Sequence, residues 1–351
     1  MKWIIYGSYG YTGNLITEKL AHSSHDIVLS GRNSVKLEKQ ADRLGIPWMK
    51  ADLSEPGEMD ALLKDAHLVI HCAGPFTHTW KKMAEACIRN ECHYLDITGE
   101  IDVFEGLKKM TSLFKNANIM ALPGAGFDVV PSDCLAGYLK KQLPDANSLE
   151  IAFMGLGGGV SKGTAKTMIE NLGEGGVVRR GGELKKVPAA FSVKKIEFED
   201  GKPRTAVSIP WGDLSTAYTS TSVPDITVYM AVPSSAVKWM KWSDKLSWIL
   251  KSRLVQKLLN QLIEMKPAGP DQKTRESGKS IFIGTVRNKS GKTFTARQIT
   301  PEGYKLTAET AVLIANKISD NDWKPGYQTP SAAYGHNLIL EIEGTERTDV
   351  K

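Results

Sequence analysis

Residues 3–13 read WIIYGSYGYTG, an apolar run followed by a turn with a glycine at every third position. Between a first strand and a helix, Gly7 permits a tight turn and Gly10 lacks the Cβ that would keep the backbone away from a pyrophosphate, while Gly13 lets the helix pack close to the sheet. The N terminus of such a helix presents unpaired N–H groups and a positive dipole end to phosphates. This context favours dinucleotide binding over a flexible loop. The residues predicted to hold the pyrophosphate are Gly7, Ser8, Tyr9, Gly10, Tyr11, Thr12 and Gly13.

The first third of the chain alternates short apolar runs with segments of helical period. The apolar runs cover residues 3–6, 26–30, 67–72, 92–97 and 117–123. Repeated βαβ units produce a parallel sheet covered by helices, because each crossover needs a helix to return the chain to the same edge of the sheet. The sequence therefore predicts an α/β domain over residues 1–125, with a doubly wound sheet of the Rossmann type.

Residues 126–327 predict a second, α+β domain that binds substrate or mediates dimerisation. Its sheet is expected to be mostly antiparallel, since runs such as 280–288 and 292–298, joined by KSGK, are typical of a β-hairpin. Helices are expected at roughly 163–172, 235–264 and 303–317. Beyond this domain, Thr329 and Pro330 suit the N-cap and first position of a final helix.

The ends of the next strands indicate which dinucleotide binds. The second strand ends in LSGRN, which supplies Arg32 where NAD-binding chains carry a carboxylate for the ribose 2′-OH. A guanidinium suits a 2′-phosphate, so NADP is predicted as the cofactor, with NAD as the alternative. Asp52 follows the third strand and suits either a contact with adenine or the cap of the next helix. After the fourth strand, HCAGPF predicts a floor under the nicotinamide, or else an ordinary turn. The floor residues are Ala73, Gly74, Pro75 and Phe76.

Composition narrows the class of protein. The 351 residues are 41% hydrophobic, and 45 basic against 39 acidic side chains give a formal net charge of only +6, which argues against a nucleic-acid partner. The four cysteines contain no CxxC pair, which favours a reducing compartment. With no leader-like segment and no run of about 18 apolar residues, a cytoplasmic location is expected. The histidines lack HExxH-type spacing, so no metal site is predicted.

Several segments together resemble the saccharopine dehydrogenase-like oxidoreductases, in particular the branch that contains the trans-acting enoyl reductases. They are GSYGYTG (7–13), LSGRN (29–33), HCAGPF (71–76), HYLDITGE (93–100), LPGAGFDVVPSDCLA (122–136), KPAGPDQKTRESGKS (266–280), TPEGYKLTAETAVLIA (300–315) and YQTPSAAYG (327–335). The resemblance implies an N-terminal NAD(P)-binding domain, an inserted α+β domain, and a C-terminal helix over 328–351 that completes the first domain. It also implies NADP-dependent hydride transfer to a C=C, C=N or C=O bond, in a cleft between the domains. The implied substrate is a small molecule or an acyl chain.

Two carboxylates are candidates for proton transfer. Asp96 lies in HYLDITGE at the end of the fifth strand, beside the expected nicotinamide. The alternative is that Asp96 and Glu100 accept hydrogen bonds from backbone amides or cap the helix that follows. Asp128 and Ser132 lie in GFDVVPSD at the junction of the two domains, where clefts form. No tyrosine is followed four residues later by lysine, which excludes the proton-transfer pair of short-chain dehydrogenases.

Residues 237–266 combine tryptophan, leucine and lysine at helical spacing. The apolar face contains Trp242, Leu246, Ile249, Leu254, Leu258 and Leu262, and the basic residues are Lys238, Lys241, Lys245, Lys251, Arg253 and Lys257. This pattern describes a helix packed on a sheet or in a homodimer contact, and equally a helix at a membrane surface or an acyl carrier. A second function hypothesis follows, in which a catalytically silent NADP-binding scaffold assembles through this helix. The glycine-dense stretch 155–176, with Lys162 and Lys166, suits a mobile flap or a merely flexible loop.

Overall fold

The computed structural model describes residues 1–21, 23–199 and 201–350, with the side chains of residues 243–245 and 253–254 outside that description. The chain divides into two compact units. Unit 1 comprises Met1–Val130 and Tyr304–Ala333, and unit 2 comprises Pro131–Gly303 and Tyr334–Lys351. The chain therefore leaves the first unit after Val130, returns to it for Tyr304–Ala333, and then enters the second unit again.

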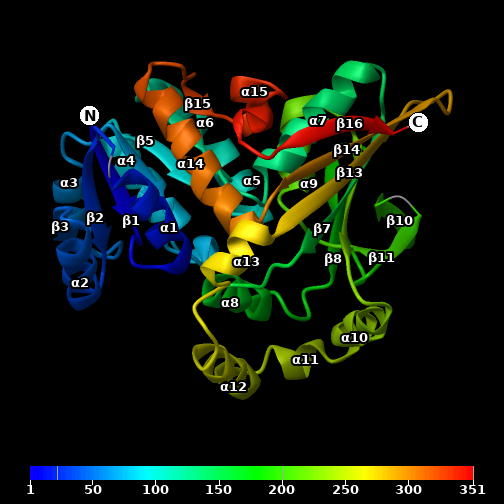
Figure 1. Cartoon of the computed structure of the whole chain (residues 1–351), viewed down its shortest axis with the longest axis horizontal. Coiled ribbons are helices and arrows are strands. Elements are labelled where there is room, and N and C mark those ends of the chain that lie inside the picture. Colours follow the sequence, from blue (N-terminus) through cyan, green and yellow to red (C-terminus); the bar gives the residue numbers. More distant parts are fainter. Residues whose placement is uncertain (22, 200, 351) are drawn as a thin grey trace. The chain divides into compact units, whose positions relative to one another are not determined.

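Unit 1 is built on a seven-stranded parallel sheet with the strand order β15-β6-β5-β4-β1-β2-β3 (Figure 1). Its strands are β1 (Lys2–Tyr6), β2 (Asp26–Gly31), β3 (Trp48–Lys50), β4 (Leu68–His71), β5 (His93–Asp96), β6 (Met120–Leu122) and β15 (Gly326–Tyr327). Its helices are α1 (Tyr11–Leu20), α2 (Ser34–Leu44), α3 (Pro56–Leu63), η1 (Phe76–His78), α4 (Trp80–Arg89), α5 (Ile101–Lys109), α6 (Thr111–Asn116), α14 (Gly303–Ser319) and α15 (Pro330–Tyr334). The order confirms the predicted doubly wound fold, and it reverses between β1 and β4. Ligands of such sheets bind outside the carboxyl ends of the strands at this reversal.

The central strands of unit 1 are apolar because helices cover both faces of the sheet. Trp3, Ile4 and Ile5 of β1 are fully buried, although successive side chains of a strand point to opposite faces. Tyr6, the last residue of β1, is also buried and donates its hydroxyl to the Ala51 carbonyl at 3.1 Å. The carboxyl end of β1, where the glycine-rich turn begins, is therefore held rigidly.

Unit 2 is an α+β unit whose nine-stranded sheet has the order β10-β11-β12-β7-β13-β14-β16, with β8 paired to β12 and β9 paired to β8. Its strands are β7 (Ser148–Leu156), β8 (Gly176–Arg180), β9 (Glu183–Val187), β10 (Val193–Glu199), β11 (Lys202–Ser208), β12 (Asp225–Ala231), β13 (Lys279–Arg287), β14 (Thr293–Pro301) and β16 (Glu346–Val350). Its helices are α7 (Val130–Gln142), α8 (Lys162–Glu170), α9 (Asp213–Thr221), α10 (Ser234–Lys245), α11 (Ser247–Leu250), α12 (Arg253–Glu264), α13 (Gln272–Ser277) and η2 (Leu338–Glu341). The β12–β7 pair is parallel and the other pairs are antiparallel, which confirms the mostly antiparallel sheet.

One hairpin of unit 2, formed by β8 and β9, was not predicted although its sequence carries a clear signal. Strands β8 and β9 are joined at Gly181 and Gly182, which have φ values of 61° and 83°. Two consecutive residues at positive φ form the turn that best matches the twist of the flanking strands, and glycine adopts it without strain. The predicted hairpin at 280–288 and 292–298 is confirmed, because β13 and β14 pair along their whole length.

Two helices expected from the sequence are wrong in their extent. The helix expected over 328–351 begins as predicted at Pro330, but α15 ends at Tyr334, where Gly335 turns the chain at a φ of 81°. The following chain forms η2 and then β16, which pairs with the edge strand β14. The backbone of β16 therefore forms hydrogen bonds with the edge strand of a sheet instead of within a helix.

The single helix expected at 237–266 is three consecutive helices, α10, α11 and α12. Ser252 causes the second break, because its extended backbone leaves the helix and its hydroxyl accepts a hydrogen bond from the Val255 amide as the N-cap of α12. Lys245, Arg253 and Leu254 were predicted to lie on the basic and apolar faces of this helix, but their side chains lie outside the described part of the structure. Among the described residues, no helix is at once long enough and apolar enough to cross a membrane.

Candidate functional site: a dinucleotide cradle at the carboxyl end of β1

The glycine-rich turn after β1 leaves no room for side chains at the predicted glycines. Gly7 has a φ of +81°, and a Cβ there would lie 2.9 Å from the Ala73 amide nitrogen. A Cβ on Gly13 would lie 2.3 Å from the Gly7 carbonyl oxygen, and one on Gly10 would lie 3.1 Å from it. The turn, the first residues of α1 and the loop after β4 are therefore packed backbone against backbone. Such packing leaves main-chain groups, not side chains, to contact a ligand.

The N terminus of α1 is suited to an anion. Gly10 is its N-cap residue, no side chain caps the helix within the described chain, and its first turn contains no acidic residue. The first N–H groups of a helix lack intrahelical partners and carry the positive end of the dipole. The Ser8 hydroxyl of the same turn is buried and has no hydrogen-bond partner among the described residues. These features fit the diphosphate of a dinucleotide, which this turn would hold.

The end of β2 carries two positive charges next to an aromatic ring. Arg32 is exposed and directly follows Gly31, where a Cβ would lie 2.7 Å from Cε1 of Tyr9. The Asn33 amide donates to the Tyr9 hydroxyl at 3.3 Å, and Lys36 Nζ lies 5.7 Å from the centre of the Tyr9 ring. Lys36 was not predicted as a site residue, although the sequence already places it in the first turn of the helix that follows β2. Arg32 and Lys36 fit the 2′-phosphate of NADP.

Asp52 sits in a local turn instead of capping a helix. Its Oδ1 accepts hydrogen bonds from the Ser54 amide at 2.9 Å and the Ser54 hydroxyl at 2.7 Å. These bonds hold the pKa of Asp52 below its usual value, and the positive charge of Arg32 contributes in the same direction. The N-cap residue of α3 is Glu55, so the helix-cap alternative for Asp52 is wrong. A contact with adenine stays a prediction.

The loop after β4 is fastened by a carboxylate from the end of β5. Glu100 Oε1 accepts from the Phe76 amide at 2.9 Å, and Oε2 accepts from the Thr77 amide at 2.6 Å and from the Thr77 hydroxyl. Thr79 closes the same loop by donating its hydroxyl to the Ala73 carbonyl at 2.9 Å. Glu100 and Thr79 therefore hold the two ends of the predicted nicotinamide floor, which comprises Ala73, Gly74, Pro75 and Phe76. The backbone-amide alternative for Glu100 is thereby confirmed.

Asp96 is a structural link between two strand ends in this structure. It is fully buried, its Oδ1 accepts from the Thr98 amide at 3.0 Å and from the Gly124 amide at 2.9 Å, and its Oδ2 accepts from the Tyr94 hydroxyl at 2.5 Å. Burial raises the pKa of Asp96 to about 6, against the opposing effect of these hydrogen bonds. With both oxygens engaged, its carboxylate positions the loops after β5 and β6, and a catalytic role stays a prediction.

Asp128 is the more accessible of the two predicted carboxylates. It follows β6, is partly exposed, and packs on Gly99, where a Cβ would lie 2.7 Å from Asp128 Oδ2. Burial raises the pKa of Asp128 to about 7, and the negative charge of Glu100 raises it further. A carboxyl group with such a pKa holds its proton in part of the molecules at neutral pH. It can therefore donate a proton where a carboxylate of ordinary pKa cannot.

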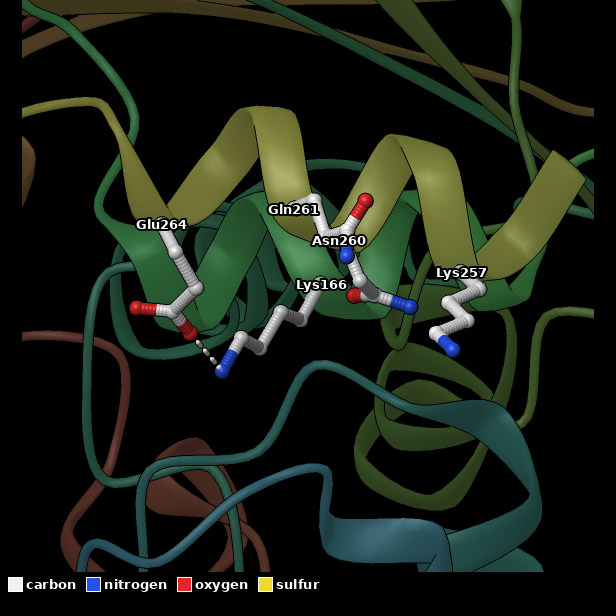
Figure 2. A pocket seen from close by; sticks show the side chains of 5 residues that line it. All are labelled: Lys166, Lys257, Asn260, Gln261 and Glu264. Atoms are coloured by element: carbon white, nitrogen blue, oxygen red, sulfur yellow. Dashed lines mark ion pairs between the residues drawn. The ribbon is translucent and has the colours of Figure 1, made fainter.

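Other sequence candidates fall into structural roles. Ser132 is buried and donates its hydroxyl to Asp213 Oδ1 at 2.6 Å, both residues lying in unit 2. Lys166, expected to attract an anion, forms an ion pair of 2.6 Å with Glu264, at a polar depression lined by side chains of α8 and α12 (Figure 2). All four cysteines are free, and burial raises the thiol pKa of Cys72, Cys87 and Cys134. None of these three is an activated nucleophile.

Comparison with known proteins agrees with this geometry. Residues 3–122 match the family profile of the saccharopine dehydrogenase NADP binding domain. The chain is 25% identical to a saccharopine dehydrogenase-like oxidoreductase of Rattus norvegicus, with 96% of this chain and 94% of the rat protein aligned. The match to the protein of the same name from Mus musculus is 27% identical and spans 50% of this chain and 47% of the mouse protein.

Similarity to the enoyl reductase branch is partial. The trans-acting enoyl reductase of Mycobacterium leprae is 33% identical over a segment that covers 37% of this chain and 33% of that protein.

The fold resembles that of apo saccharopine dehydrogenase (L-Glu forming) from Saccharomyces cerevisiae, with a TM-score of 0.71, 14% identity and full coverage of both chains. The cradle and these comparisons together show an NADP-binding domain of the saccharopine dehydrogenase type at residues 3–122, in a chain that is similar over 96% of its length to a saccharopine dehydrogenase-like oxidoreductase.

Proposed function

We propose that this protein uses NADPH to reduce a C=C, C=N or C=O bond of a small or acyl-chain substrate. The observation that carries the proposal is the placement of the cradle and a protonatable carboxyl group at one edge of the unit 1 sheet. The glycine-rich turn follows β1, the Glu100-fastened loop follows β4, and Asp128 follows β6. Parallel strands are about 4.8 Å apart, so the carboxyl ends of β1, β4, β5 and β6 face a single ligand.

The residues at this edge of the sheet have separate roles in the proposed reduction. NADPH supplies the hydride when it is bound. The turn and the N terminus of α1 hold its diphosphate, while Arg32 and Lys36 bind the 2′-phosphate and so select NADPH over NADH. The floor residues, fastened by Glu100, exclude water from one face of the nicotinamide. Reduction of the double bond also consumes one proton, which the Asp128 carboxyl group supplies to the substrate atom that does not receive the hydride.

The acyl-chain class is supported by the partial similarity to proteins named trans-acting enoyl reductases. For that class the bond is an enoyl C=C, and the hydride adds to one carbon while Asp128 protonates the other. An imine or a carbonyl would instead accept the proton on nitrogen or oxygen. The identity of the atoms that receive hydride and proton therefore distinguishes the three substrate classes.

The test is a turnover assay with one substrate of each class, with NADPH oxidation as the readout and mass spectrometry of the product. NADPH with deuterium at the transferable position marks the atom that receives the hydride. We expect turnover of one class, with an acid-dependent rate that falls as the pH rises above about 7, because Asp128 then loses its proton. Asp128→Asn should remove this dependence and most of the turnover.

NADPH binding without turnover of any class would support the silent scaffold instead. A pH profile unchanged in Asp128→Asn, together with full turnover, would assign the proton donor to another residue. The buried Asp133, which accepts from Ser220 in unit 2, offers a matched control: Asp133→Asn should leave the pH profile unchanged.

A further inference from the structure

The helices α10, α11 and α12 expose an unusual concentration of large apolar side chains. We name this region the α10–α12 surface and define it by six exposed residues: Trp239, Trp242, Trp248, Leu258, Leu262 and Met265. Trp239 is 76% exposed, Trp248 is 75% exposed and Met265 is 83% exposed. Single exposed apolar residues are ordinary, but tryptophan is normally among the more buried types, and here three lie within ten residues.

Packing accounts for only one face of these helices. On α12, Ile263 is buried and Val255 and Leu259 are half-buried on the side that meets α8. Leu258, Leu262 and Met265 follow one another at the spacing i, i+4 and i+7, so they form a separate apolar stripe. Figure 1 shows α10, α11 and α12 in a row at the lower edge of unit 2, below α8 and away from the β13–β14 hairpin. The side chains of the apolar stripe of α12 and the tryptophans of α10 and α11 are therefore each at least half exposed.

The same region carries almost all of the net charge of the chain. Residues 234–266 contain seven basic and two acidic side chains, a net charge of +5, whereas the whole chain carries +6. Of the two acidic residues, Glu264 forms an ion pair with Lys166 of α8 at 2.6 Å (Figure 2). It also pairs with Lys162, the first residue of α8, at 3.4 Å. Lys251 pairs with Glu174 at 2.7 Å. Lys238, Lys241 and Lys257 are exposed and form no ion pair within the described part of the chain.

Positive charge next to exposed tryptophan and leucine matches the chemistry of an anionic bilayer surface. Indole rings sit at the level of lipid headgroups, where one end is apolar and the other is wet. Lysines beside them gain about 1 kcal/mol each near an anionic leaflet. A second copy of the chain fits less well, because a two-fold interface would bring two patches of +5 together. An acidic protein partner would satisfy the lysines but not the full row of apolar side chains on three successive helices.

We propose that the α10–α12 surface docks the protein reversibly on membranes that contain anionic lipid. Trp239, Trp242 and Trp248 enter the headgroup region together with Leu258, Leu262 and Met265. The lysines remain at the level of the lipid phosphates. The contact is interfacial, it requires no helix that spans the bilayer, and it is independent of the reduction proposed above.

The test is co-sedimentation of the full chain with vesicles of phosphatidylcholine alone and of phosphatidylcholine mixed with phosphatidylglycerol, at low and high salt. Binding is expected to the mixed vesicles only and to weaken at high salt. Lys238→Glu with Lys241→Glu should reduce partitioning at least about 30-fold, since two lost lysine contacts of about 1 kcal/mol each already give this factor. The matched control is Lys185→Glu with Lys186→Glu, which makes the same charge change at exposed positions of β9. This variant should reduce partitioning less, because only the lower net charge of the chain acts there.

A second pair of variants tests the tryptophans. Replacement of Trp239, Trp242 and Trp248 by alanine should reduce partitioning at least about tenfold. Trp48→Ala, at an exposed tryptophan of β3, should leave it unchanged. NADPH binding, measured in parallel, reports that each variant is folded.

Three outcomes would overturn the proposal. They are the absence of the wild-type chain from anionic vesicle pellets, equal partitioning of the triple tryptophan variant and the wild type, and a wild-type dimer in light scattering that the triple variant loses while neither binds vesicles. The last result would assign the surface to a second copy of the chain. Because turnover is not the readout, none of these outcomes bears on the proposed reduction.

Discussion

Gly13→Ala tests whether close packing of α1 on the turn is what makes the cradle. The new Cβ would lie 2.3 Å from the Gly7 carbonyl oxygen, where ordinary contact begins at 3.4 Å, so α1 must move by about 1 Å. A hydrogen bond of about 2.9 Å from the helix N terminus to a phosphate would then exceed the range of a real bond. Loss of one charge-assisted bond costs about 1.5–3 kcal/mol, which predicts NADPH binding weakened by about tenfold to 100-fold.

Stability should change less than affinity in this variant. Alanine in place of glycine within a helix gains about 1 kcal/mol. Overpacking costs about 1–3 kcal/mol, so the net loss is about 0–2 kcal/mol. Gly57→Ala is the matched control: Gly57 lies in α3 with nothing within 4 Å of the added Cβ, so this variant should gain stability and keep its affinity. Fluorescence titration with NADPH and thermal unfolding measure both effects. Wild-type NADPH affinity in Gly13→Ala would falsify the assignment of the turn as the phosphate site.

Three further predictions concern the neighbouring residues. Arg32→Ala should weaken NADPH binding about tenfold or more and leave NADH binding unchanged in parallel fluorescence titrations, and an equal loss for both cofactors would remove the 2′-phosphate assignment. Asp96→Ala should lower the free energy of unfolding by about 3 kcal/mol or more, because the buried Thr98 and Gly124 amides lose their acceptor; Asp96→Asn should lose less, and a fully stable Asp96→Ala in thermal unfolding would contradict this structural role. Glu100→Ala should speed amide hydrogen exchange at Phe76 and Thr77 and weaken NADPH binding several-fold, whereas Glu85→Ala on the exposed side of α4 should change neither.

The pH dependence of the structure follows from the two raised carboxyl pKa values. Asp96 and Asp128 have folded-state pKa values of about 6 and about 7, above the ordinary value of 3.8. The folded state therefore holds protons that the unfolded state has released. The stability that these two groups contribute is fully present below the ordinary value of 3.8 and is lost as the pH rises from there through about 6 and about 7. This is the opposite of the usual behaviour of carboxylates, and its main cause is burial, which disfavours the charged form of each carboxyl group.

The fold of unit 1 was predictable because its requirements are local. A strand buried on both faces needs a continuous apolar run, and a turn against which another backbone packs needs glycine. Residues 3–13 alone therefore predict a buried strand followed by a tight turn. Arg32 was expected beside the cradle only because it directly follows β2 in the sequence. The helices expected at 237–266 and 328–351 were predicted to be too long. Helical period does not reveal where a serine cap ends one helix and begins another, or where the backbone pairs with a sheet edge instead.

The sequence by itself determined the order of βα units and the glycine-rich turn, and it predicted the preference for a 2′-phosphate, since each depends on residue identity at one strand end. Only the tertiary structure decided that Glu100 fastens the loop at Phe76, that Asp96 joins the ends of β5 and β6, and that burial raises the pKa of Asp128 to about 7. These roles depend on which strand ends are neighbours in the sheet, across 24 residues for Glu100 and Phe76 and 28 for Asp96 and Gly124. Contacts at that separation are fixed by strand pairing and burial, which no local pattern records.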